Sequence, residues 1–209
     1  MSFPATILSA TTKLITGAQV FWKFEANNEK PKIYFANHSS HLDTVVIWSA
    51  LEEALRKSTR PVAAMDYWGK GDLKKYIAKD ILNALLIERK SEEGRFNPRD
   101  VIDAMINCIK DGYSLIIFPE GTRNTNGEIS SFKSGLYYLY EECLLADFVP
   151  VYLENLNRIL PKGEFIFIPL LSSVTFGEPL ERIDGEEKEP FLNRAKENIL
   201  ELKKERDGC

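Results

Sequence analysis

Short, mostly apolar runs of four or five residues recur along the chain, separated by longer segments in which apolar residues follow helical spacing. Apolar runs of this length are typical of strands buried on both faces, and the intervening segments are typical of helices that cover a sheet. Alternating strands and helices predict an α/β fold with a mainly parallel, mixed sheet flanked by helices. We expect strands at residues 33–36, 61–65, 84–87, 114–118, 149–152 and within 165–176, and helices at 44–57, 72–82, 98–111, from 135 onward and at 191–204.

Residues 1–24 carry a different pattern, which predicts an N-terminal amphipathic helix ahead of an α/β domain at residues 25–209. This segment is too polar to cross a bilayer, and no basic residue precedes its apolar part, so a secretory leader is not expected. The pattern suits a helix in the membrane interface, with Trp22 and Lys23 at its edge, and equally a helix that covers the protein's own core. Its apolar face comprises Ile7, Leu8, Thr11, Leu14, Ile15, Ala18, Phe21 and Trp22.

Composition and charge limit the function further. The 209 residues suit one domain, and 44% hydrophobic with 28% charged residues is typical of a folded soluble or peripheral protein. A formal net charge of −4 gives no sign of a nucleic-acid partner. The three cysteines, Cys108, Cys143 and Cys209, lack metal or redox spacing, and their odd number favours a reducing compartment. Together with the pattern of an interfacial helix at the N-terminus, a reducing compartment leads us to expect a cytoplasmic protein held peripherally on the inner face of the cell membrane.

Positive charge is concentrated between residues 56 and 79, which contain seven Lys or Arg residues and two Asp residues. Tyr67 and Trp68 lie among these charges. A basic segment with aromatic residues suits anionic lipid headgroups or an acidic carrier. The simpler alternative is a solvated face of the folded domain.

Both histidines of the chain lie in one stretch, Asn37-His38-Ser39-Ser40-His41-Leu42-Asp43, between a predicted strand and a predicted helix. Imidazole has a reference pKa of about 6.5, so His38 is suited to accept a proton near neutral pH. A carboxylate five residues later, at Asp43, is able to fold back and fix the tautomer of the ring. Two alternatives remain open. Asp43 also fits a helix capping box, and His38, His41 and Asp43 are all metal-ligand types, although no further histidine completes a zinc site.

Two other predicted strands also end in charged residues, at Glu88-Arg89 and at Pro119-Glu120-Gly121-Thr122-Arg123. Gly121 permits a tight turn and close approach of a ligand, and Thr122 with Arg123 suits a phosphate. Lys133, just before the next predicted helix, adds a further cation. Neither a Gly-x-Ser-x-Gly elbow nor a glycine-rich nucleotide loop is present, which favours direct attack by a substrate hydroxyl.

These motifs closely resemble the four blocks of the glycerolipid acyltransferase family, which includes the 1-acylglycerol-3-phosphate acyltransferases. The first block, a His and an Asp separated by four residues, resembles the stretch from Asn37 to Asp43. The other three resemble Ile87-Glu88-Arg89, Phe118 to Arg123 followed by Phe132 to Gly135, and Val149-Pro150-Val151. The second block differs from the family pattern, since Asn83 or Ala84 stands where a glycine is often found.

The resemblance implies an O-acyltransferase domain at residues 25–209 that moves a fatty acyl group from acyl-CoA or acyl carrier protein to a lysophosphatidate-type acceptor. The reaction that the resemblance implies needs neither a metal nor a prosthetic group. His38 would be the general base and Asp43 its partner, and the membrane surface would supply the acceptor. Three alternatives remain: a non-enzymatic lipid-binding protein, an enzyme for another lysolipid or amine-bearing acceptor, and a metal-dependent hydrolase. The substrate-binding residues that the resemblance implies are Arg89, Glu120, Gly121, Thr122, Arg123 and Lys133.

Overall fold

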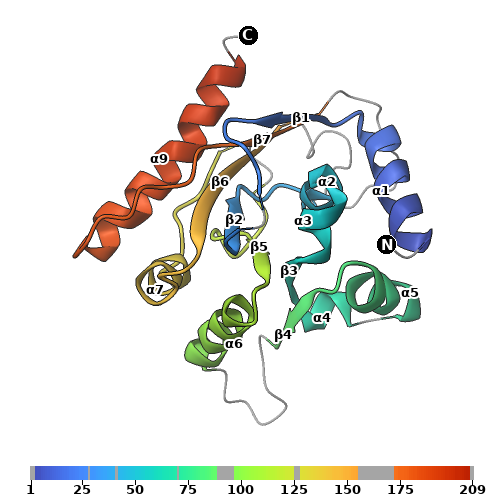
Figure 1. The fold of residues 1–209 in the computed structure, drawn as a ribbon, viewed down its shortest axis with the longest axis horizontal. Helices are drawn as coiled ribbons and strands as arrows, with labels where there is room; N and C mark the ends of the chain where they lie inside the picture. The colour runs from blue at the N-terminus through green and yellow to red at the C-terminus, as the bar shows by residue number, and fades with distance from the viewer. Residues whose placement is uncertain are drawn as a thin grey trace.

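A single twisted β-sheet forms the centre of the molecule (Figure 1). The computed structural model describes residues 3–27, 29–40, 42–69, 71–88, 97–124, 128–154 and 172–207. Within these residues the sheet has seven strands in the order β1-β7-β6-β2-β5-β3-β4, and all neighbours are parallel except the antiparallel pair β6 and β7. The predicted α/β fold with a mainly parallel, mixed sheet is confirmed. The strands are β1 (Gln19–Trp22), β2 (Lys32–Ala36), β3 (Thr59–Ala64), β4 (Leu85–Ile87), β5 (Ser114–Ile117), β6 (Asp147–Glu154) and β7 (Ser173–Phe176).

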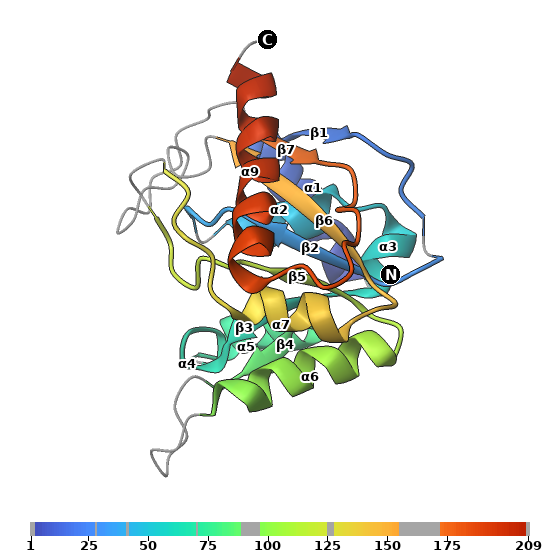
Figure 2. The same cartoon turned by 90° about the vertical axis from the view of Figure 1, so that its left-hand side faces the viewer.

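Strand β2 lies at the middle of the sheet, and all five of its residues are buried. Alternate side chains of β2 enter two separate apolar cores, Ile33 and Phe35 on one face and Tyr34 and Ala36 on the other. Helices α6 (Pro98–Lys110), α7 (Gly135–Glu142) and α9 (Lys188–Asp207) cover the first face (Figure 2). Helices α1 (Phe3–Thr16) and α2 (Asp43–Ala50) cover the second.

The helix after β2 is shorter than predicted, whereas the helix predicted at 72–82 is helical from Asp72 to Ile81. The expected helix at 44–57 is interrupted, because Leu51 and Glu52 are extended with ψ angles of 148° and 159°, and α3 (Glu53–Lys57) follows the break. Helix α4 (Met65–Trp68) and helix α5 (Asp72–Tyr76) follow β3, and a π-helical turn, Ile77–Ile81, continues α5. Helix α6 begins as predicted, since the Asn97 side chain accepts a hydrogen bond from the N–H of Arg99.

The predicted N-terminal helix is present, but the prediction that it extends over residues 1–24 is wrong. Helix α1 ends at Thr16, and Gly17 takes a positive φ of 54°, which ends a helix at little cost for a glycine. Residues Gln19–Trp22 then form β1 and pair in parallel with β7. Phe21 and Trp22 therefore belong to the sheet, where the Trp22 ring stacks on Phe176 with a centroid distance of 3.8 Å.

Helix α1 packs with its small and hydroxylated residues toward the protein. Ala5, Ser9, Thr12 and Thr16 are buried, and the Ser9 hydroxyl donates a hydrogen bond to the carbonyl of Ser49 on α2. The large apolar residues predicted to share a face instead point largely outward, because Ile7, Leu14 and Ile15 are exposed. The length and apolar content needed to cross a bilayer are found in no helix among the described residues.

Candidate active site

Two strand ends bring the candidate residues together. Strands β2 and β5 are parallel neighbours, with Phe35 opposite Ile117, so the residues after each strand emerge at the same edge of the sheet. Ligand sites of open α/β sheets lie at this edge. The first segment, residues 37–43, carries His38 and Asp43, and the second, residues 118–124, carries the predicted phosphate-binding turn.

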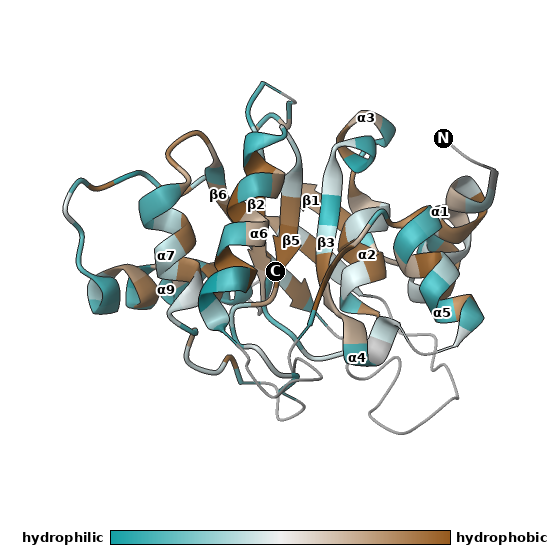
Figure 3. Cartoon of the chain, turned by 90° about the horizontal axis from the view of Figure 1, so that it is seen from below, coloured by the Kyte–Doolittle hydropathy of each residue, from teal (hydrophilic) through white to brown (hydrophobic). Residues whose placement is uncertain are grey.

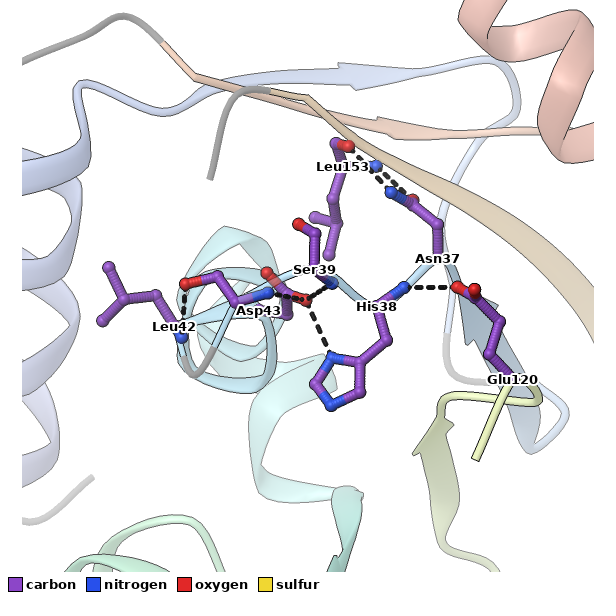
Figure 4. A network of polar contacts seen from close by, with 8 residues as sticks. Asn37, His38, Ser39, Leu42, Asp43, Glu120 and Leu153 are labelled. Atoms are coloured by element: carbon purple, nitrogen blue, oxygen red, sulfur yellow. Dashed lines mark hydrogen bonds and ion pairs between the residues drawn. The ribbon is translucent and has the colours of Figure 1, made fainter. Parts of the chain in front are cut away.

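His38 and Asp43 form a direct pair. The Nδ1 atom of His38 lies 2.8 Å from Oδ2 of Asp43, whose side chain is fully buried (Figure 4). The same oxygen accepts hydrogen bonds from the backbone N–H groups of Ser39 at 2.6 Å and Ser40 at 2.9 Å. Asp43 thus performs both roles weighed from the sequence: it accepts backbone N–H groups before α2, as in a capping box, and it orients the imidazole.

This arrangement determines which ring nitrogen of His38 is available for chemistry. Because Nδ1 faces a carboxylate, the neutral ring carries its proton on Nδ1 and its lone pair on Nε2. Nε2 points away from Asp43, and the side chain of His38 is 20% exposed (Figure 4). Phe118 stacks on the imidazole with a centroid distance of 4.1 Å and an interplanar angle of 20°. The imidazole is therefore held at one edge by the carboxylate of Asp43 and on one face by the ring of Phe118.

Glu120 connects the two segments. Its carboxylate accepts the backbone N–H of His38 through Oε1 and that of Ser130 through Oε2, each at 2.8 Å. The residue is only 2% exposed. The N–H of Asn124 in turn donates to the carbonyl of His38 at 2.8 Å. Both backbone groups of His38 are consequently bonded to residues 120–124.

Asn37 fixes the other side of the histidine segment. Its Nδ2 donates to the carbonyl of Leu153 at 3.0 Å, and its Oδ1 accepts the N–H of Leu153 at 2.8 Å (Figure 4). Leu153 belongs to β6, which pairs with β2 on the side opposite β5. The side chain of Asn37 therefore extends the β2–β6 pairing by one residue beyond the end of β2.

The turn that contains Gly121, Thr122 and Arg123 adjoins the backbone of His38. Gly121 has a φ of 71°, which favours glycine. A Cβ atom at Gly121 would lie 3.5 Å from Cγ and 3.7 Å from Cε of Lys133, so the lysine side chain runs along the glycine. Thr122 and Lys133 are exposed, and Arg123 is half-buried. Because Asn124 is bonded to His38, this turn, which carries Thr122 and Arg123 and is lined by Lys133, lies next to the histidine.

The structure leaves part of the predicted site undescribed. Arg89 and His41 lie outside the described residues, so the role of Arg89 and the metal alternative that includes His41 both stay predictions. Glu88 is described and exposed at the end of β4. Two strands, β5 and β3, separate β4 from β2 in the sheet order, so Glu88 and His38 emerge at the same edge from strands that are not neighbours.

Two of the cysteines are unsuited to nucleophilic chemistry. Cys108 and Cys143 are buried, in the core on the side of α6 and α7. Burial raises the pKa of the Cys143 thiol to about 11 and also raises the pKa of Cys108. A thiol with a raised pKa is almost entirely protonated at neutral pH, so neither side chain offers a reactive thiolate.

Several residues of the site carried no role in the sequence analysis. Asn37 and Phe118 lie within the recognised motifs, and their position at strand ends is the sequence signal that could have identified them as site residues. Asn124, Ser130 and Leu153 contribute through backbone groups. Backbone contacts between distant segments leave no trace in residue type, so sequence patterns do not reveal them.

The chain belongs to the acyltransferase family, whose model matches residues 19–154. Its sequence is 27% identical over 179 residues to the chloroplastic 1-acyl-sn-glycerol-3-phosphate acyltransferase LPAT1 of Arabidopsis thaliana, covering 84% of this chain and 46% of that protein. It is likewise 27% identical over 183 residues to the 1-acyl-sn-glycerol-3-phosphate acyltransferase of Limnanthes alba, covering 81% of this chain and 60% of that protein. The chain spans about half the length of the curated relatives it matches.

The fold is similar to a solved structure. The crystal structure of the 1-acyl-sn-glycerophosphate acyltransferase PlsC from Thermotoga maritima superposes with a TM-score of 0.68, covering 95% of this chain and 79% of that chain. The two sequences are 21% identical, so this similarity concerns the fold alone.

Proposed function

We propose that this protein transfers a fatty acyl group from an acyl thioester, acyl-CoA or acyl carrier protein, to the free hydroxyl of 1-acylglycerol 3-phosphate, giving phosphatidate for phospholipid synthesis. The observation that carries this proposal is the His38–Asp43 pair beside a turn that holds a hydroxyl and two cations. A general base next to a phosphate-binding turn suits an acceptor with both an alcohol and a phosphate. The names of the relatives agree with this substrate class.

His38 performs the proton transfers in the proposed reaction. Its Nε2 takes the proton of the acceptor hydroxyl while the oxygen attacks the thioester carbonyl and forms a tetrahedral intermediate. Asp43 stabilises the imidazolium that results, because its carboxylate accepts from Nδ1. Collapse of the intermediate breaks the C–S bond, and the imidazolium returns the proton to the departing thiolate. An ester and a free thiol leave, and the neutral histidine is restored.

The acceptor phosphate is proposed to bind at the turn after β5. The positive φ of Gly121 opens the turn, and the absence of a side chain there lets an anion approach the backbone. The hydroxyl of Thr122, the guanidinium of Arg123 and the ammonium of Lys133 supply donors and positive charge. Arg89 is proposed as a further phosphate ligand from the sequence motif alone.

Arg123→Ala is expected to raise the KM for 1-acylglycerol 3-phosphate by roughly 10–100-fold and to change kcat by much less, because the proposed partner of the guanidinium is a phosphate that takes no part in bond making or breaking. Steady-state kinetics at saturating acyl thioester would measure both constants. As a matched control, Arg60→Ala removes an arginine that donates to the carbonyl of Asn83, and it should leave the acceptor KM unchanged. An unchanged KM in Arg123→Ala would contradict the phosphate-binding role.

A peripheral membrane contact is proposed through α1 and α5. Figures 1 and 3 both place these helices at the same end of the molecule. Leu14 on α1 is 84% exposed and Leu73 on α5 is 71% exposed. Helices on a water-facing surface usually bury their leucines against the protein. Lysines accompany these apolar residues, which suits an anionic bilayer surface. The membrane-facing residues are Ile7, Lys13, Leu14 and Ile15 from α1, with Leu73, Lys74, Lys75, Tyr76 and Lys79 from α5 and the following turn.

Replacing Leu14 and Leu73 together by Gln should lower affinity for anionic vesicles by at least about tenfold, because each buried leucine contributes roughly 1.5–3 kcal/mol. Cosedimentation with phosphatidylcholine vesicles containing phosphatidylglycerol would measure the change. Leu145→Gln, which alters an equally exposed leucine in the turn after α7, is the matched control and should bind as the wild type does. Equal binding by the double variant would show that this face does not meet the membrane.

A donor-by-acceptor matrix with mass-spectrometric detection tests the proposed activity. Acyl-CoA and acyl carrier protein would each be offered with glycerol 3-phosphate, 1-acylglycerol 3-phosphate, a lysophospholipid with a blocked phosphate and an amine-bearing lipid. The proposal predicts phosphatidate as the main product. A different acylated product would reassign the acceptor, and no product from any pair would favour a lipid-binding protein without catalysis.

A further inference from the structure

We propose that Glu120 is a positioning residue for His38 and that it does not contact the acceptor phosphate. The resemblance to the glycerolipid acyltransferases implies that Glu120 binds substrate, and the contacts of the side chain favour a different role. The inference rests on the proposed function in one respect, since it assumes that the position of the His38 ring limits the rate of transfer.

The carboxylate of Glu120 is poorly placed to bind a phosphate. It is only 2% exposed, and each of its oxygens already accepts a backbone N–H at 2.8 Å. A carboxylate also repels a phosphate, and this repulsion is stronger in a buried, weakly screened position than in water. The exposed hydroxyl of Thr122 in the same turn and the exposed ammonium of Lys133, whose side chain runs along Gly121, are better suited to the anion.

The two N–H groups that Glu120 accepts belong to separate segments. One is the N–H of His38, 82 residues away in the sequence, and the other is the N–H of Ser130, ten residues away. The N–H of Asn124 donates to the carbonyl of His38, so residues 120–124 hold both backbone groups of the histidine. One anionic side chain thereby fixes the turn after β2 relative to the loop after β5.

A second side chain holds the same turn from the opposite direction. Asn37 exchanges two hydrogen bonds with the backbone of Leu153 on β6, whereas Glu120 acts from the side of β5. The backbone of His38 is therefore held between both sheet neighbours of β2, and the ring is then aligned by Asp43 and Phe118. Misplacing a reacting group by about 1 Å is able to reduce a rate about 10²-fold, so this restraint has a kinetic consequence.

Glu120→Gln is the sharpest test because the side chains have the same shape but glutamine has one acceptor oxygen and an NH₂ group. Its NH₂ must face the N–H of either His38 or Ser130 and loses that hydrogen bond. We expect kcat to fall by roughly 10–100-fold while the acceptor KM stays within about twofold of the wild-type value. Glu142→Gln, which alters an exposed carboxylate paired with Arg99, is the matched control and should change neither constant.

A spectroscopic measurement separates this inference from the proposed function. The chain has two histidines, so comparison with His38→Ala assigns the ring signals of His38 in a ¹H–¹⁵N spectrum. Glu120→Gln should shift these signals, and Glu142→Gln should not, whether or not the protein transfers acyl groups. Unmoved His38 signals would overturn the proposal. So would a raised acceptor KM with an unchanged kcat, since that result places Glu120 in contact with substrate.

Asn37→Asp provides the same test from the β6 side if Glu120→Gln fails to fold. The aspartate keeps the acceptor for the N–H of Leu153 but places a second oxygen against the Leu153 carbonyl. We expect displaced His38 ring signals and a lower kcat with an acceptor KM within about twofold of wild type. Unchanged ring signals and an unchanged kcat in this variant would show that restraint of the His38 segment does not limit the rate, which overturns the positioning role of Glu120 as well.

Discussion

Replacing His38 by alanine is expected to reduce kcat for acyl transfer by about 10²–10⁴-fold, the usual contribution of a positioned general base. The imidazole is the group whose free nitrogen, Nε2, points away from the buried carboxylate of Asp43 and is available to an incoming hydroxyl. No other described histidine can take over this role. The fold should survive, because Asp43 keeps its two backbone N–H donors from Ser39 and Ser40.

The measurement is the initial rate of phosphatidate formation, together with the thermal unfolding temperature as a check of folding. His41→Ala is the matched control, since it removes the second histidine of the same segment. The base mechanism predicts a loss of less than about tenfold for this control. The metal alternative would be supported by two results together. Both histidine variants would lose all activity, and the wild type would lose activity in chelator and regain it when metal is added. Wild-type turnover by His38→Ala would remove the histidine from the mechanism.

The second large effect is expected for Asp43→Asn, with a loss of kcat on the order of 10³-fold. The amide oxygen still accepts from Ser39 and Ser40, so the start of α2 is preserved. The same oxygen faces Nδ1 of His38, but it now belongs to a neutral amide, so the full negative charge beside the ring is lost. The imidazolium formed during proton transfer loses its partner at the same time.

Asp100→Asn is the matched control for this variant. Asp100 is an exposed aspartate in the first turn of α6, where its carboxylate accepts from the side chain of Asn97. Both substitutions remove a negative charge near the N-terminus of a helix, so both weaken the favourable interaction of that charge with the helix dipole. Rates for both substrates and unfolding temperatures would be compared. If Asp43→Asn loses no more activity than Asp100→Asn, Asp43 serves the helix alone.

The sequence predicted the centre of the site because its essential contact is local. His38 and Asp43 are five residues apart, and the apolar run before them and the helix after them determine that they meet across one turn. The strand pattern likewise predicted a parallel sheet, since residues 33–36 and 114–118 each read as a buried strand. Neighbouring parallel strands then bring their ends to one edge without further information.

The remainder depends on contacts that residue type does not encode. Glu120 meets His38 through a backbone N–H, and nothing in the spacing of these residues distinguishes that contact from substrate binding. The N-terminal helix shows a similar limit. Periodicity identified its apolar face, but the face that packs on α2 consists of small residues such as Ala5 and Ser9, whose low hydrophobicity gives little signal. The positive φ of Gly17 and the pairing of β1 with β7 decide where the helix ends.

The central claim is that His38 activates an alcohol for direct transfer of an acyl chain from a thioester. The most direct measurement is simultaneous detection of thiol release and phosphatidate formation from acyl thioester and 1-acylglycerol 3-phosphate. The proposed mechanism predicts one thiol for each phosphatidate, no thiol release without the acceptor, and loss of both signals in His38→Ala. Thiol release without phosphatidate, or an acylated protein that accumulates before the acceptor is added, would contradict it.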